Sequence, residues 1–182
     1  MPNRVMARFT SGVDGTNTTV EETIFSNTVP AAPAITDGFR VLVKGLHTKP
    51  SVNSTLRIRL KIGGILFAEF GGGTVLGNWA TAYVNPWSFE IDMMPALSSG
   101  SRCFGWFRLS DIAAGSVAPS EDGNQVEMQQ PGRELLIYKA TPSPSSLNGQ
   151  PIVVTSQWSV APGAGRAPYA GVRHVVLATI ES

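Results

Sequence analysis

Residues 56–70 read LRIRLKIGGILFAEF. In the first seven positions apolar side chains alternate with cations, a period of two that is typical of a β-strand with one buried and one solvated face. Gly63-Gly64 follows, and a second β-rich run begins at Ile65. A two-residue glycine turn between two such runs predicts a hairpin. We expect the apolar residues of the first strand to face a core, because the opposite register would bury three cations.

Similar runs recur along the chain. They cover residues 19–25, 39–46, 87–94, 102–109, 134–140, 152–160 and 172–180, and segments rich in Gly and Pro separate them. No stretch has helical periodicity long enough to predict more than one helical turn. About nine strands with few helices predict an all-β fold, a jelly-roll-like antiparallel β-sandwich of eight or nine strands.

The length of 182 residues fits one domain. We expect an N-terminal arm at residues 1–15 and a single β-sandwich domain at residues 16–182. The arm lacks the apolar core and cleavage site of a secretory signal. No segment approaches the roughly 20 apolar residues that a membrane span requires, so no membrane partner is expected.

Charge also restricts the partners. Fourteen Lys and Arg against thirteen Asp and Glu leave a net charge of +1, so no global field favours nucleic acid, and no direct nucleic-acid binding is expected. Charged residues make up only 15% of the chain, which is low for a freely soluble monomer. We therefore expect neighbouring copies to cover part of the surface, in a closed oligomer such as a homotrimer.

The sequence offers little for catalysis. His47 and His174 are the only side chains that could act as a base at neutral pH, and neither lies in a recognisable motif. Glu90 and Asp92 share one strand face about 7 Å apart, but alternating acids are ordinary on a solvated face. Cys103 is alone, which excludes an internal disulfide and a cysteine metal cluster. We predict no catalytic residue, no cofactor and no metal site, and no enzymatic activity.

Two further patterns have alternative interpretations. The cations Arg57, Arg59 and Lys61 could contact phosphates, but strand cations more often pair with acids on a neighbouring strand. The aromatic residues could form a sugar platform, but Trp87 and Trp158 are in phase with apolar neighbours, which favours the core.

Residues 16–31 read TNTTVEETIFSNTVPA. This segment resembles the opening of a group of small virion proteins of tailed bacteriophages. The likeness continues through residues 56–64, the Asn85-Pro86-Trp87 entry into a strand and the closing block at residues 157–177, so it covers most of residues 16–180. The resemblance implies a jelly-roll virion component, often trimeric, found as a capsid decoration (cement) protein or as the tip of a fibre.

Two roles follow from this resemblance. The first is a non-enzymatic decoration protein that binds the major capsid protein, or another virion protein, on the outer surface of the head. The second is a receptor- or carbohydrate-binding tip of a tail or head fibre. The chain has no coiled coil or fibre repeat, which favours the first. The expected location is the virion, after synthesis in the host cytoplasm, where a lone cysteine would stay reduced.

The candidate partner contacts lie where the chain departs from that pattern. They are Arg4, Val5, Met6, Arg8 and Phe9 in the N-terminal arm, and Glu121, Asp122 and Asn124 in the long segment at residues 113–131. Apolar residues of the arm could dock on a partner while its cations pair with acids there. The alternatives are a frayed terminus for the arm, and a turn or a weak calcium site for the acidic residues.

Overall fold

The chain is described here by a computed structural model. It describes residues 4–10, 12–35, 37–48, 50–76, 84–95, 101–109, 134–140, 147–165, 167 and 169–180. The segment at residues 113–131, with Glu121, Asp122 and Asn124, lies outside them. The described part contains no helix that is long and apolar enough to cross a membrane.

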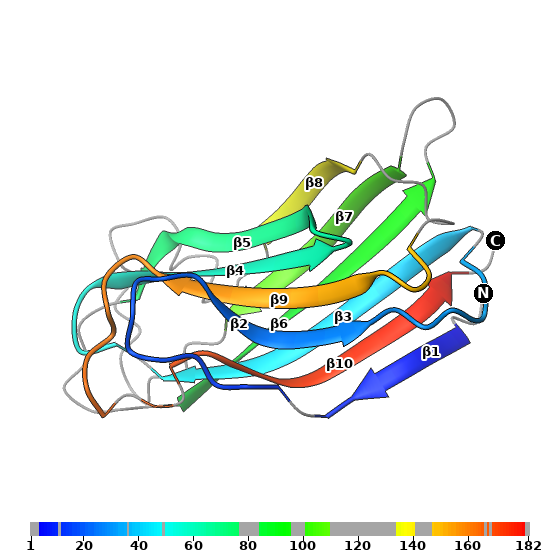
Figure 1. Ribbon diagram of the computed structural model, residues 1–182. Helices are drawn as coiled ribbons and strands as arrows, with labels where there is room; N and C mark the ends of the chain where they lie inside the picture. Colours follow the sequence, from blue (N-terminus) through cyan, green and yellow to red (C-terminus); the bar gives the residue numbers. More distant parts are fainter. Residues whose placement is uncertain are drawn as a thin grey trace.

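The described residues form ten strands in two antiparallel sheets (Figure 1). The six-stranded sheet has the order β1 (Arg4–Phe9), β10 (Gly171–Ile180), β3 (Gly38–Thr48), β6 (Val84–Pro95), β7 (Ser101–Leu109) and β8 (Glu134–Ala140). The four-stranded sheet has the order β2 (Glu22–Thr28), β9 (Pro151–Trp158), β4 (Ser54–Ile62) and β5 (Ile65–Leu76).

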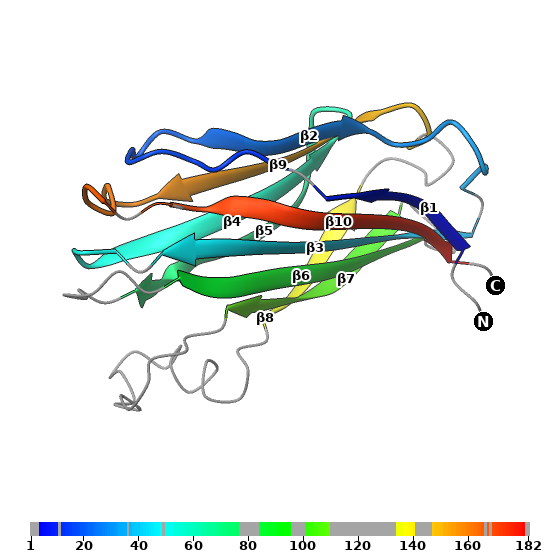
Figure 2. The ribbon, with the colours of Figure 1, turned by 90° about the horizontal axis from the view of Figure 1, so that it is seen from below.

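The strand order is that of a jelly roll. β1 pairs with β10, β2 with β9, β3 with β6 and β4 with β5, so the chain is folded as nested pairs that alternate between the sheets. β7 and β8 extend the six-stranded sheet beyond β6. Figure 2 shows the two sheets as stacked layers. The predicted all-β jelly-roll sandwich is thus confirmed.

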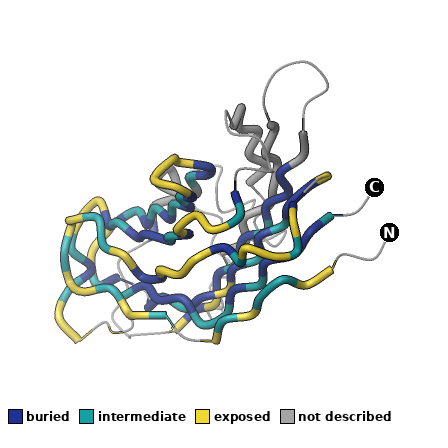
Figure 3. Tube along the Cα trace, turned by 45° about the vertical axis from the view of Figure 1, so that its right-hand side comes forward, coloured by how far each residue is buried: buried dark blue, intermediate teal, exposed yellow. Residues whose placement is uncertain are grey.

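The hairpin prediction is confirmed in detail. Along β4 the alternating apolar residues Leu56, Ile58, Leu60 and Ile62 are buried, and the intervening residues are half-buried on the outer face. Gly63 and Gly64 have φ values of +59° and +79°, the left-handed conformation that a tight hairpin turn requires at both central positions. Figure 3 shows how buried and exposed positions are distributed along the chain.

The N-terminal segment differs from the sequence expectation. Instead of an arm outside the sandwich, residues 4–9 form β1, an edge strand that pairs with β10. A β-bulge between Val5 and Ala7 interrupts the pairing, so apolar residues do not alternate regularly here. That irregularity hid the strand from period-two reasoning, and it explains why the structure has one strand more than predicted.

Candidate functional site

The three cations of β4, Arg57, Arg59 and Lys61, all form ion pairs with acids of the same chain. Arg59 forms ion pairs with Glu21, at 2.9 Å, and with Glu69, at 2.6 Å. Lys61 lies 2.6 Å from Glu21, and the Nε of Arg57 lies 3.3 Å from Glu69. The interpretation that these cations pair with acids is confirmed, and the pairs form one network across the outer face of the four-stranded sheet.

Glu21 is the acidic centre of this network. Burial alone would raise the pKa of its carboxyl, but hydrogen bonds from Lys61 and Thr155 and the positive charges of Arg59 and Lys61 outweigh it, so the pKa lies below its ordinary value. A lowered carboxyl pKa means that the ionised form stabilises the folded state.

We expect acid to remove this stabilisation. The contribution of Glu21 is fully present above the pKa of the unfolded chain, near 4.5, and is lost as the pH falls through the lower folded-state value. Glu21→Gln should lower the free energy of unfolding by about 1 kcal/mol at pH 7 and reduce the loss on acidification. Urea unfolding at several pH values between neutrality and acid measures both effects. An unchanged pH dependence in the variant would contradict this role.

The acids Glu90 and Asp92 occupy the outer face of the six-stranded sheet. Arg40 contacts Asp92 through Nε at 2.5 Å and Nη2 at 2.6 Å, and Glu90 through Nη1 at 3.1 Å. The hydrogen bond to Asp92 raises the pKa of the Arg40 guanidinium above its ordinary value. Both carboxylates are therefore held by one cation.

The two histidines lie on separate strands. His47 is buried at the end of β3, with its ring centroid 6.3 Å from that of Trp158. His174 is half-buried on β10, opposite Lys44 of β3. Within the described residues, no group of three or more His, Cys, Asp or Glu side chains could hold a metal ion.

The predicted contact residues of the N-terminal segment fall into two sets. Met6 and Phe9 are partly buried and pack against the core, and the ring of Phe9 lies 5.5 Å from that of Phe25. Arg4, Val5 and Arg8 are exposed. The first set serves the sandwich itself, and only the second set is accessible to a partner.

Three segments distant in the sequence meet at the left of Figure 1, where β9 ends. Ser51 donates its backbone N–H to the carbonyl of Pro162 at 2.8 Å, and Gly163 donates to the side chain of Asn17 at 2.9 Å. We call residues 12–21, 50–53 and 159–165 the loop end. Among the described residues it carries four of the eight exposed large apolar side chains, namely Val13, Val20, Val52 and Val160.

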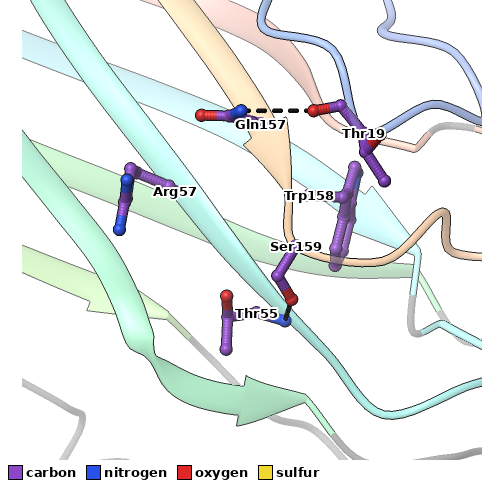
Figure 4. A pocket seen from close by; sticks show the side chains of 6 residues that line it. All are labelled: Thr19, Thr55, Arg57, Gln157, Trp158 and Ser159. Atoms are coloured by element: carbon purple, nitrogen blue, oxygen red, sulfur yellow. Dashed lines mark hydrogen bonds between the residues drawn. The ribbon is translucent and has the colours of Figure 1, made fainter.

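A pocket of about 250 Å³ opens beside the loop end on the outer face of the four-stranded sheet (Figure 4). Its lining residues are Thr19, Thr55, Arg57, Gln157, Trp158 and Ser159. Sequence reasoning missed this site because its residues come from three separate segments, and each of them is ordinary for a turn or a strand. Only the long-range pairing of β4 with β9 brings them together.

Comparison with known proteins gives little guidance. No protein-family model matches the chain, and no curated protein matches it. Among solved structures, the chain is similar to the CBM2 module of the evolved Dit of Lactobacillus casei BL23 phage J-1, with 9% identity and a TM-score of 0.42 over 86% of this chain and 70% of that one. A likeness at this level implies nothing about function.

Proposed function

We propose that this chain is a non-enzymatic structural protein of a tailed-phage virion, and that it decorates the outer surface of the head. The resemblance of residues 16–31 and of the closing block to small virion proteins supports the virion role. That resemblance implied a jelly roll, and the chain has one. A fibre tip is the alternative, and it differs from a decoration protein in copy number and location.

The position of β1 is the observation that carries the proposed attachment. β1 is an edge strand, so the backbone groups on its outer side have no strand partner within the described chain. Its apolar residues Met6 and Phe9 face the core, while Arg4, Val5 and Arg8 are exposed. An exposed valine between two cations suits a protein surface that combines an apolar contact with acidic side chains. The major capsid protein is the proposed partner.

We further propose that the chain acts as a homotrimer. The low share of charged residues, 15%, favours contacts between copies, and a closed ring satisfies them without growth into filaments. A ring would also place several β1 strands against the capsid at once, which strengthens attachment without any new kind of contact.

Charge reversal at β1 tests the attachment. We expect the double variant Val5→Asp, Arg8→Glu to fold but to bind about tenfold or more weakly to particles that were assembled without the protein, because it replaces an apolar and a cationic contact with acids. Mass spectrometry of the particles after re-addition measures occupancy.

Lys44→Glu is the matched control. Lys44 is also an exposed cation of the six-stranded sheet, but it lies on β3 rather than at the edge. The Lys44→Glu variant should bind to the particles as the unaltered protein does. Full occupancy by the β1 variant would remove β1 from the proposed attachment surface.

A further inference from the structure

The pocket beside the loop end presents polar groups of several kinds. Thr19, Thr55 and Ser159 supply hydroxyls, Gln157 an amide and Arg57 a guanidinium, while Trp158 supplies an indole. Figure 4 shows that these side chains come from the end of β9, the start of β4 and the segment before β2. Among the described residues that line the pocket, Arg57 is the charged one, and its Nε also lies 3.3 Å from the carboxylate of Glu69.

Contacts within the protein hold the polar groups in place. The Oε1 of Gln157 accepts a hydrogen bond from Arg59 at 2.9 Å, and its Nε2 donates to the carbonyl of Thr19 at 3.2 Å. The Oγ of Ser159 accepts the backbone N–H of Thr55 at 2.8 Å. A ligand would therefore meet groups that are already ordered, which lowers the entropic cost of binding.

Trp158 closes the pocket on its core side. Its side chain is 2% exposed, and its ring centroid lies 6.3 Å from that of His47 on the opposite sheet, so the ring packs in the core between the sheets. The polar groups that a ligand would meet therefore come from the other five lining residues.

The volume of the pocket and the apolar residues beside it restrict the class of ligand. A volume of about 250 Å³ is below the range of roughly 300–1,000 Å³ that is usual for drug-sized ligands, and it suits a single small ring. The exposed valines Val20 and Val160 directly follow the lining residues Thr19 and Ser159. Hydroxyls and an amide beside apolar surface match a sugar ring, which has hydroxyl groups at its edge and C–H groups on its faces.

We propose that this pocket binds one acidic sugar, a uronic acid unit of a polysaccharide, with its carboxylate at Arg57 and its hydroxyls at Gln157 and the three hydroxyl residues. An arginine pairs well with a carboxylate because its planar fork can donate two hydrogen bonds. The site lies on the sheet opposite to the one that carries β1, so it does not depend on the proposed attachment.

Titration of the isolated protein tests the site. D-glucuronate and D-galacturonate are added to ¹⁵N-labelled protein, with D-glucose, D-galactose and acetate as comparisons, and amide shifts are followed by NMR. We expect at least one uronate to shift the amides of residues 55–57 and 157–159 and to bind about tenfold more tightly than its neutral counterpart and than acetate.

Two variants localise the effect. Arg57→Gln should weaken uronate binding about tenfold or more, whereas Lys61→Gln, which removes a cation from the same strand face outside the pocket, should change it less than about twofold. No uronate-dependent shift at these amides, an equal response to acetate, or an unchanged affinity of Arg57→Gln would each overturn the proposal. None of these outcomes affects the test of β1 attachment, which uses particles.

Discussion

Ile58→Asp is expected to abolish folding of the protein. Ile58 is fully buried in β4, the strand that lies between β5 and β9, so an aspartate there would place a charge in the core with no cation beside it. The cost of an unpaired buried charge, above about 4 kcal/mol, is a large part of the stability of a typical domain. Circular dichroism and the dispersion of amide signals in NMR would report the loss.

Arg57→Ser is the matched control on the same strand. Arg57 faces outward, and its ion pair with Glu69 is 3.3 Å long and partly exposed. Its replacement should lower the free energy of unfolding by less than about 1 kcal/mol. A folded Ile58→Asp variant with unchanged stability would contradict the assigned register of β4.

Gly45→Ala should cause the second-largest loss. Gly45 lies on β3 opposite Trp87 of β6, and a Cβ at this position would overlap both the indole of Trp87 and the carbonyl oxygen of Gly171. Trp87 is 1% exposed and cannot turn into solvent, and the carbonyl belongs to the neighbouring strand β10. We expect the free energy of unfolding to fall by about 3 kcal/mol.

Gly15→Ala offers a comparison for Gly45→Ala. The nearest atoms to a Cβ at Gly15 lie 3.1 Å to 3.3 Å away, so small shifts relieve the contact, and the expected loss is under about 1 kcal/mol. Urea midpoints for both variants measure the difference. Equal urea midpoints for the two variants would contradict the close packing of Trp87 against β3.

The strands that alternate regularly could be predicted from sequence because burial of one sheet face imposes the period. β4 is the clearest case, and the same period predicts Trp87 and Trp158 in the core, which their burial confirms. β1 could not be found in this way, because its bulge places the consecutive residues Met6 and Ala7 on the core side and breaks the alternation.

Long-range contacts limited what the sequence could say about the sites. The cations of β4 were expected to meet acids, but Glu21, which lies 40 residues before Lys61, could not be identified as a partner without the pairing of β2, β9 and β4. The pocket has the same origin, because Thr19, Thr55 and Gln157 become neighbours only through the sheet. The partner contacts proposed for residues 113–131 stay a prediction.

The fold separates the two proposed surfaces. β1 lies at one edge of the six-stranded sheet, toward the right of Figure 1, whereas the pocket lies on the other sheet beside the loop end at the left. A protein attached through β1 can therefore keep the loop end and its pocket accessible to solvent. This arrangement suits a protein that binds a particle with one surface and a polysaccharide with another.

Cryo-electron microscopy of the intact phage particle tests the central claim most directly. The account predicts many copies of the jelly roll on the outer surface of the head, grouped in threes, with β1 toward the major capsid protein and the loop end toward solvent. A few copies confined to the tail or to a fibre tip, or head-bound copies with the loop end against the capsid, would contradict it.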